Sequence, residues 1–326
     1  KYSTFSAQRK GLLNENQPAL GLGTGQQTVS DDGYEWALRG AFFRLNYIYN
    51  DRYLFEVNGR YDGTSRFPSD NRFVFLPSFS AAWRISEEPF MQSTRSWLDN
   101  LKIRASYGIV GSDVTTGDRY LYRQVYNKGD ASYFGEVPQA YDSYKEGDLG
   151  NNHVTWEKAK KFDIGLDMNL FDKISFTIDY FYDKRYDQLV AKNDIPLILG
   201  VGLAPTNVAR TSNKGIDGQL GFQTRLGQVD FNTNFVFSYA KNKVEYKAEA
   251  QQKYPWLAQT GKPIGQTFGY TCLGYYTPED IEKIKSGAED APAVPNLDVP
   301  IQAGDLKYKD LNGDKIIDDY DKSAIG

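Results

Sequence analysis

The feature that most constrains the fold of this chain is a strict two-residue alternation of apolar and polar side chains over long stretches. Between residues 162 and 170 the apolar positions are Phe162, Ile164, Leu166, Met168 and Leu170, and the positions between them are Asp163, Gly165, Asp167 and Asn169. The same alternation runs through the stretches 39–49, 52–63, 72–85, 158–170, 174–187, 213–224 and 229–242. Because successive side chains of a β-strand point to opposite faces, each stretch predicts a strand with one apolar and one wet face.

Two kinds of all-β protein have strands of this pattern, the soluble antiparallel sandwich and the transmembrane antiparallel β-barrel. The predicted strands are about twice as long as the usual strand of about five or six residues, which favours the barrel. Their polar faces carry Asp, Asn, Ser, Thr and Gly rather than the Lys and Glu of an ordinary solvated surface. We therefore expect an all-β fold, a transmembrane antiparallel β-barrel whose polar face lines water.

The connections between the predicted strands alternate between tight and long, as they do in outer-membrane barrels. Tight turns are predicted at 49–51, 171–173 and 226–228, and longer loops at 62–71, at 188–210 and from 243 onward. The link from Ser86 to Asp99 is the exception, because it is long for a turn on the periplasmic side.

The positions of the predicted strands and connections divide the chain into two parts. Residues 1–242 are predicted to hold roughly eight transmembrane strands and their loops, with one more strand near the N-terminus and a short pair near 119–126 inside an outer loop. Residues 243–326 are predicted to be a long extracellular loop region. Its segment 278–287 predicts one short helix, because an acidic first turn follows Pro278 and Gly287 provides a stop.

The composition excludes several classes of function. The formal charge is −4 and the pI about 5.3, which gives a nucleic-acid partner no electrostatic support. The chain has one cysteine, Cys272, and one histidine, His153, so it has no intrachain disulfide, and a Ser-His-Asp site would need His153 as its base. We expect Cys272 to be a buried free thiol and His153 an ordinary loop residue. No enzyme is predicted.

Aromatic residues are abundant, with 24 Tyr, 19 Phe and 5 Trp. On the predicted strands we expect them to face lipid and to form girdles at the membrane interfaces. Loop aromatics are candidates to stack on sugar rings or to pack against a lid protein: Tyr254, Trp256, Phe268, Tyr275 and Tyr276. An alternative is therefore a secreted β-rich module that binds carbohydrate. A hydrolase carried on a barrel ranks last, because no nucleophile–base pair is visible.

Near the end of the sequence, the stretch DLNGDKIIDDYD has the oxygen spacing of a calcium loop. The predicted ligands are the side chains of Asp310, Asn312, Asp314, Asp318 and Asp321 and the backbone carbonyl of Ile316. Lys315 stands where a glycine usually makes the sharp turn, so it adopts a left-handed conformation or the loop turns differently. The predicted cofactor is a structural Ca²⁺ that stiffens an outer loop. The alternative is a solvated acidic loop that binds no ion.

Five separated motifs, in order, resemble the SusC/RagA class of TonB-dependent outer-membrane transporters. The longest is FMQSTRSWLDNLKIRASYGIVGS at 90–112, which is similar to the class signature WL..LKIRASYG..GN, with Ser112 where Asn is commoner. The others are WEKAKKFDIGLD at 156–167, NKGID at 213–217, TGKPIGQTFGY at 260–270 and GDLKYKDLNGD at 304–314. The resemblance extends over nearly the whole chain.

This resemblance implies more than the alternation shows. Members of the class have a 22-stranded barrel with an N-terminal plug, and a surface lipoprotein of the SusD class forms a lid over it. They lie in the outer membrane of Gram-negative bacteria and import glycans, or in some members oligopeptides, with energy delivered by TonB. We expect this chain to be part of the larger barrel, with the plug, the TonB-contacting segment and the closing C-terminal strands outside it.

Overall fold

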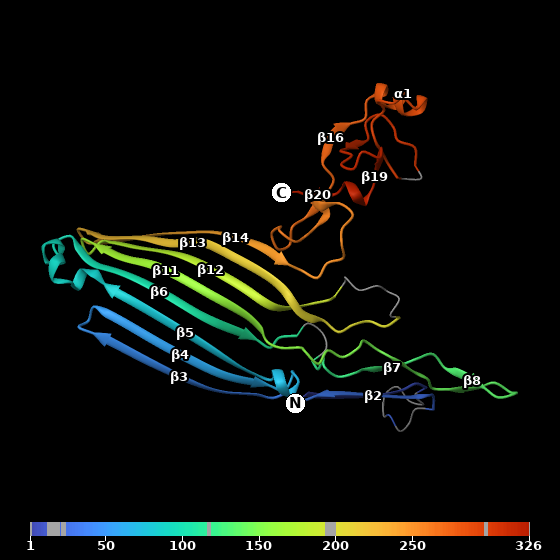
Figure 1. The fold of residues 1–326 in the computed structure, drawn as a ribbon, viewed down its shortest axis with the longest axis horizontal. Helices are drawn as coiled ribbons and strands as arrows, with labels where there is room; N and C mark the ends of the chain where they lie inside the picture. Colours follow the sequence, from blue (N-terminus) through green and yellow to red (C-terminus); the bar gives the residue numbers. More distant parts are fainter. Residues whose placement is uncertain are drawn as a thin grey trace.

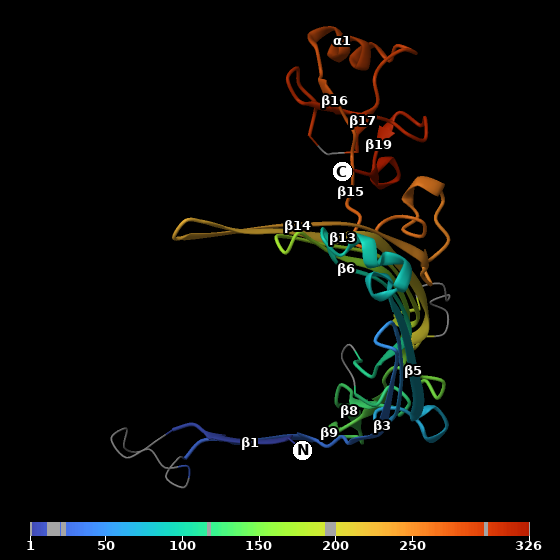
Figure 2. The same cartoon turned by 90° about the vertical axis from the view of Figure 1, so that its left-hand side faces the viewer.

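Eight long strands form one antiparallel sheet in the computed structural model, which describes residues 2–11, 20, 24–115, 119–192, 200–296 and 299–325. The strands are β3 (Leu38–Tyr49), β4 (Tyr53–Thr64), β5 (Phe73–Arg84), β6 (Leu98–Ser112), β11 (Glu157–Leu170), β12 (Ile174–Val190), β13 (Thr206–Leu226) and β14 (Val229–Tyr246). Their order in the sheet is β14-β13-β12-β11-β6-β5-β4-β3, so sequence neighbours are also neighbours in space. The sheet curls into an arc, as Figure 2 shows, and forms part of a barrel wall.

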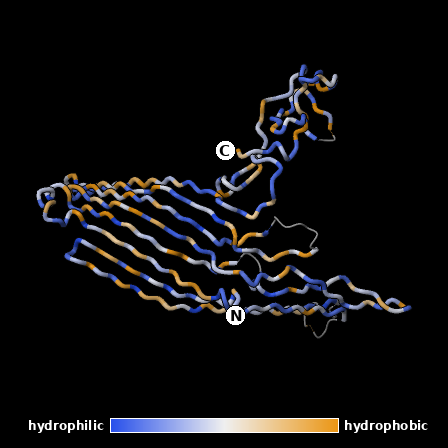
Figure 3. The backbone as a smooth tube through the Cα atoms, viewed as in Figure 1, coloured by the Kyte–Doolittle hydropathy of each residue, from blue (hydrophilic) through white to orange (hydrophobic). Residues whose placement is uncertain are grey.

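The alternation predicts the strands well, and the hydropathy along each of them changes with nearly every residue (Figure 3). One row of register partners shows the apolar face: Leu45, Val57, Phe79, Tyr107, Phe162 and Tyr182 lie side by side across six strands. These side chains have no protein layer over them, since Leu45 and Phe79 are 65% and 50% exposed. An uncovered apolar face of this extent needs another apolar partner, and lipid is that partner in a membrane barrel.

Tight turns join the strands at one end of the sheet, and the long loops lie at the other end (Figure 1). Asn50 and Asp51 (φ 50° and 55°) and Phe171 and Asp172 (φ 56° and 51°) make two turns with both central residues left-handed. This is the type I′ geometry, whose twist matches that of the strands it joins. Gly227, at φ 65°, opens the third tight turn. The predicted alternation of short and long connections is confirmed.

The link between β5 and β6 is long because it is folded. It contains two short 3₁₀ helices, η3 (Ile85–Glu87) and η4 (Pro89–Thr94), at the same end as the tight turns. The predicted short pair near 119–126 is wrong. The short strands of this loop follow that segment, with β7 (Tyr126–Lys128) paired to β10 (Tyr144–Glu146) and β8 (Ser132–Phe134) to β9 (Gln139–Tyr141). The one strand predicted near the N-terminus is a separate hairpin of β1 (Tyr2–Arg9) and β2 (Gln27–Tyr34).

Beyond Tyr246 the chain leaves the sheet and forms a small lobe at the long-loop end (Figure 1). Its elements are η6 (Pro255–Leu257), β15 (Phe268–Gly269), β16 (Cys272–Tyr275), α1 (Pro278–Ser286), β17 (Val294–Pro295), β18 (Leu306–Tyr308), β19 (Ile316–Ile317), η7 (Asp319–Asp321) and β20 (Ser323–Ala324). The predicted helix is confirmed as α1. Thr277 and Asp280 form a capping box at its start, and Gly287 ends it with φ 67°. No helix among the described residues has the length and apolar character needed to cross a membrane.

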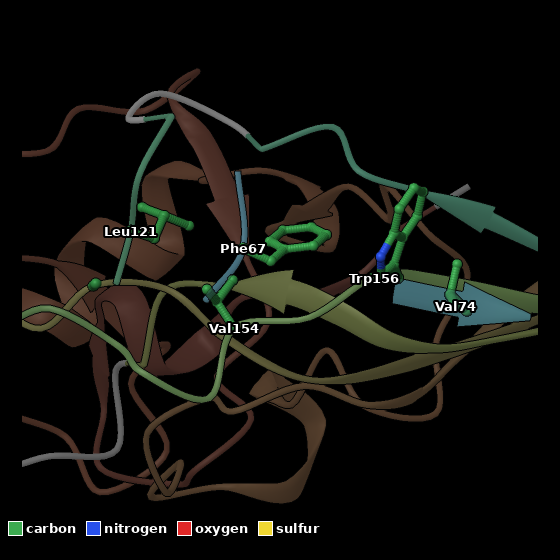
Figure 4. Packing of buried hydrophobic residues seen from close by; sticks show 6 residues of the cluster. Phe67, Val74, Leu121, Val154 and Trp156 are labelled. Carbon is green, nitrogen blue, oxygen red and sulfur yellow. The ribbon is translucent and has the colours of Figure 1, made fainter. Parts of the chain in front are cut away.

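A compact hydrophobic core lies beneath the long loops rather than in the sheet (Figure 4). Its buried members are Phe67, Val74, Leu121, Val154, Trp156 and Ala204, which come from three loops and the strand ends beside them. The rings of Phe67 and Trp156 meet edge to face with centroids 5.7 Å apart, and Trp156 Nε1 donates a hydrogen bond to the Arg72 carbonyl at 3.0 Å. This core holds the loop ends in a fixed arrangement over the sheet. The 3₁₀ helix η2 (Ser69–Asn71) lies within the first of these loops.

Candidate functional site on the polar face of the sheet

The face opposite the apolar rows carries charged and amide side chains, and it is hollowed. One row of register partners on this face runs Ala82, Arg104, Gly165, Asp179, Asp217 and Ser238. A hollow of about 530 Å³ lies over β3–β6 and is lined by Arg44, Glu56, Lys102, Arg104 and Asp163 among others. Because the opposite face of the sheet is apolar and exposed, this polar face is the one that lines the lumen in a barrel.

Arg104 is the centre of an ion-pair network that crosses three strands. Its guanidinium contacts Asp163 at 3.2 Å and Asp167 at 3.3 Å on β11, and Asp179 at 2.7 Å on β12. Lys102 binds the other side of the network, 2.9 Å from Asp167. Planar guanidinium donors suit several carboxylates at once. The network holds β6, β11 and β12 in register and leaves a net negative charge on the lumen wall.

Gly165 makes this network possible. It lies on β11 between Arg104 and Asp179 in the same row, so the guanidinium must pass directly over it to reach β12. A Cβ atom at this position would lie 2.2 Å from Asp179 Oδ1 and 2.6 Å from Arg104 Cζ. Only a glycine therefore fits beneath the ion pair.

The polar face continues toward the tight-turn end as a surface of amides and hydroxyls. A hollow of about 370 Å³ there is lined by Asn169, Ser175, Gln219, Asn232 and Asn234 among others. Gln219 Nε2 donates to Asn234 Oδ1 at 3.0 Å, which joins β13 to β14. Neutral donors and acceptors of this kind bind water, sugar hydroxyls and peptide groups equally well.

At the tight-turn edge of the apolar face, aromatic rings form part of a girdle. Tyr53 stacks between Tyr49 and Trp83, with ring centroids 6.4 Å away on each side. The Tyr53 hydroxyl and Trp83 Nε1 both donate to Glu88, at 2.7 Å and 3.0 Å. The Tyr53 hydroxyl bond, more than any other contact, lowers the pKa of Glu88 below its ordinary value. Rings with one polar tip are typical of a membrane–water interface.

The predicted calcium loop folds around its own backbone amides. Asp310 accepts from the N–H groups of Gly313 at 2.6 Å and of Lys315 at 2.8 Å. Asp321 is fully buried and accepts from Leu311 at 2.7 Å and Asp318 at 3.0 Å. Lys315 has φ 67°, so of the two possibilities stated above it adopts the left-handed conformation.

The remaining predicted ligands lie in the same loop. Asn312 and Asp314 contact one another at 2.8 Å, and Asp314 accepts from the Ile316 N–H at 2.9 Å, while Asp318 caps η7. Among the described residues, no group of three or more His, Cys, Asp or Glu is arranged to hold a metal ion. Calcium binding by Asp310, Asn312, Asp314, Ile316, Asp318 and Asp321 stays a prediction.

The loop aromatics differ in what they can reach. Tyr254 stacks on Trp256 with ring centroids 4.6 Å apart, and Trp256 Nε1 donates to the Tyr320 carbonyl at 2.8 Å, so this pair holds the lobe together. Tyr276 is buried, with 2% of its surface exposed, whereas Tyr275 is 66% exposed. Of the two neighbours only Tyr275 can meet a ligand or a lid.

Cys272 corrects another expectation, because it is exposed rather than buried. It begins β16, which in the described part of the chain forms a two-stranded sheet with β18. So small a sheet leaves the thiol without a covering layer.

Comparison with known proteins agrees with this architecture. The family described as TonB dependent receptor-like, beta-barrel matches residues 1–295. The chain belongs to the TonB-dependent receptor family. This is a family of outer-membrane barrels of Gram-negative bacteria and not of enzymes, which excludes the hydrolase and the secreted module.

Relatives of this TonB-dependent receptor chain include TonB-dependent receptor P3 of Formosa agariphila, 28% identical over 99% of this chain and 32% of the relative. TonB-dependent receptor SusC of Bacteroides thetaiotaomicron is 29% identical over 86% of this chain and 27% of the relative. The chain spans about a third of the length of these curated relatives. The expected SusC-like character is confirmed.

Solved structures show the same fold. The RagAB peptide importer in its closed-closed state matches with a TM-score of 0.66 at 19% identity, over 96% of this chain and 32% of the matched chain. Its open-open state matches with a TM-score of 0.67 at 18% identity, over 96% and 31%. The sheet is therefore one sector of a larger TonB-dependent receptor barrel.

Sequence reasoning did not single out Arg104, although the residue lies inside the motif LKIRASYG. Its position on the polar face follows from the alternation. The contacts of Arg104 could not be predicted in this way. They depend on the register of three strands and on Gly165, which is distant in the sequence. For the aspartates of β11 the alternation predicts a place on the polar face of the strand but not the ion pairs with Arg104.

Proposed function

We propose that this chain forms part of the wall of a transporter that imports nutrient oligomers across the outer membrane. The observation that carries the proposal is the two-faced sheet. Its apolar face is uncovered, and its opposite face carries the Arg104 network and amide side chains. A wall of this kind separates lipid from a water-filled passage. Energy would come from TonB, through parts of the protein outside this chain.

The proposed cargo is a glycan or an oligopeptide. Both are rich in hydroxyl or amide groups, and the lumen side of β12–β14 offers the complementary donors and acceptors of Gln219, Asn232 and Asn234. The matched RagAB protein is a peptide importer, which supports the oligopeptide class. The resemblance of the sequence motifs to the SusC/RagA class supports the glycan class. The polar face alone favours neither.

The proposed partner is a surface lipoprotein of the SusD class that covers the barrel from outside. Support comes from the long-loop end, where the core around Phe67 and Trp156 fixes the loops and the lobe beyond Tyr246 rises above the sheet. Tyr275 is exposed on that lobe. A rigid, partly aromatic outer surface suits a lid that docks repeatedly.

The function is tested in cells that carry the full-length protein or lack its gene. Growth on single glycans and on oligopeptides as sole nutrient is compared, and the protein is purified from native membranes to identify what accompanies it. We expect the deletion to lose growth on one class of oligomer, and a lipoprotein to co-purify. Unchanged growth on every oligomer, with the receptor recovered alone, would contradict the proposal.

We also propose a structural Ca²⁺ in the loop from Asp310 to Asp321. What supports it is the spacing of the oxygen ligands and the left-handed Lys315, which gives the loop the sharp turn such sites need. The ion would bind Asp310, Asn312 and Asp314 and brace the outer lobe. No catalytic role follows from it.

A further inference from the structure

The apolar face changes character abruptly at the long-loop end of four adjacent strands. On β11 the outward residues are apolar from Leu170 to Phe162, and the next outward residue is Lys160. On β12 the change from Tyr182 to Lys184 is the same. β13 and β14 follow the same rule, with lysine next after Ile216 and after Tyr239. We call the lysines beyond this boundary the lysine patch: Lys158, Lys160, Lys184, Lys214, Lys241 and Lys243.

The patch lies at the height of the outer lipid headgroups. The run from Leu170 to Phe162 covers eight steps, about 26 Å along a strand at about 3.3 Å per residue. With a strand tilt of about 40°, that is about 20 Å along the membrane normal, and Lys160 lies about 5 Å higher. An outer-membrane barrel has an apolar band about 25 Å tall. The lysines therefore begin where the hydrocarbon ends, on the side that faces lipid.

Like charges are placed directly opposite one another in this patch. Lys160 is the register partner of Lys184 on the neighbouring strand, and Lys214 is the register partner of Lys241. Side chains directly opposite in an antiparallel pair have Cβ atoms only about 5 Å apart, and like charges there repel. A sheet keeps such pairs at little cost when an anion lies between them.

The protein itself supplies few anions on this face. Glu245 lies 3.3 Å from Lys184, and Asp187 lies 3.5 Å from Lys158. Among the described residues, no carboxylate lies within ion-pair distance of Lys160, Lys214, Lys241 or Lys243. Lys158 and Lys160 instead approach the ring of Tyr186, at 5.9 Å and 5.3 Å from its centroid. The patch has six positive charges and two negative ones, in a chain whose net charge is −4.

The other half of the sheet shows that this is not a uniform interfacial ring of lysines. On β3–β6 the outward positions toward the long loops hold Phe43, Tyr61, Phe75 and Ile109, and the basic residue on that side, Arg39, packs over Phe73 at 5.0 Å. A girdle that only anchors the barrel in the membrane would follow the whole circumference. Among the described residues of the sheet, the outward lysines at this height lie on β11–β14.

We propose that the lysine patch binds the phosphate groups of anionic lipid headgroups in the outer leaflet. Phosphate oxygens would lie between the paired lysines, and the acyl chains would lie along the apolar residues below, such as Phe162 and Ile216. This inference rests on the membrane-spanning sheet and not on the cargo or the partner. It gives the β11–β14 side of the barrel a preferred lipid neighbour.

The test uses the full-length protein in detergent, with phosphatidic acid as the probe and native mass spectrometry to count bound lipid. The patch variant carries Lys160→Gln, Lys214→Gln and Lys241→Gln. The control variant carries Lys145→Gln, Lys285→Gln and Lys309→Gln, three exposed lysines outside the sheet's apolar face. Each lysine near a lipid surface contributes about fivefold in affinity, so the patch variant should bind about a hundredfold more weakly. The control should bind as the wild type does, and added salt should weaken wild-type binding.

Equal binding of phosphatidic acid by the patch variant and the wild type would overturn the proposal. Equal wild-type affinity for phosphatidylcholine would do so as well. A further arm adds inorganic phosphate, and if it occupies the patch as tightly as the lipid does, the site is one for free phosphate. Heat-dependent gel migration checks that each variant is folded. If the triple variant is not, Lys214→Gln and Lys214→Arg replace it, with about a fivefold loss expected for the first and none for the second.

Discussion

Gly165 offers a direct test of how the lumen wall is held together. Replacing it with alanine puts a methyl group 2.2 Å from Asp179 Oδ1 and 2.8 Å from Arg104 Nη1. The guanidinium must move, and it then loses its bonds to Asp179 at 2.7 Å and to Asp163 at 3.2 Å. The three atoms nearest to the new methyl group all belong to the Asp179 and Arg104 side chains, so the cost falls on the ion pairs.

The size of the effect follows from those two bonds. A hydrogen bond to a charged group contributes about 1.5 to 3 kcal/mol, and the lower value applies because about a third of the Arg104 side chain is exposed. Two such bonds give about 3 kcal/mol, from which the more restricted unfolded chain of alanine subtracts about 0.5 kcal/mol. We expect Gly165→Ala to lower the free energy of unfolding by about 2.5 kcal/mol.

Urea unfolding of the full-length protein in lipid vesicles, followed by tryptophan fluorescence, measures this difference. Gly221→Ala is the matched control, because Gly221 lies on the same face and its new methyl group would meet the rotatable Ser175 hydroxyl at 2.4 Å. The control should be neutral or slightly stabilising. In an Arg104→Ala background the cost of Gly165→Ala should nearly vanish. An equal cost in both backgrounds would show that backbone strain, not the network, explains the glycine.

Three further predictions concern the loops and the turn end. Phe67→Ala should lower the free energy of unfolding of the loop core by about 3 kcal/mol or more, and limited proteolysis should then cut the long loops faster. The control, Tyr133→Ala at an exposed position, should leave the rate of proteolysis unchanged. The Tyr53 hydroxyl holds the pKa of Glu88 below its usual 4.5. The stability that this contact gives the turn end should therefore be complete above pH 4.5 and be lost as the pH falls through the lower folded pKa. Thermal melts at a series of pH values should show this loss of stability in the wild type and not in Glu88→Gln. Calorimetry with Ca²⁺ should show a binding site that Asp314→Ala weakens, and equal, negligible heats would end the calcium proposal.

The strands and their faces could be predicted because the alternation has a physical period that a single sequence displays. The segment from Phe162 to Leu170 lies in strand β11, as the alternation predicts, and its faces are as expected. The Arg104–Asp179 pair could not be predicted, since the two residues are 75 positions apart and meet only through the register of the strand between them. Cys272 was misjudged for a related reason. The burial of a thiol depends on how many strands surround it.

The mean hydropathy of the chain is −0.58, yet the distribution of burial shows a sheet whose exposed apolar face needs lipid. Phe67 in the loop core is 1% exposed, whereas Phe235 and Tyr239 on β14 are 63% and 66% exposed. Burying apolar surface contributes about 25 cal/mol per Å² wherever the apolar partner comes from. For the loops that partner is protein, and for the sheet it is the bilayer. The outer loops can therefore keep a fixed shape in water while the strands beneath them are stabilised by the membrane, and these two contributions should respond separately to proteolysis and to lipid removal.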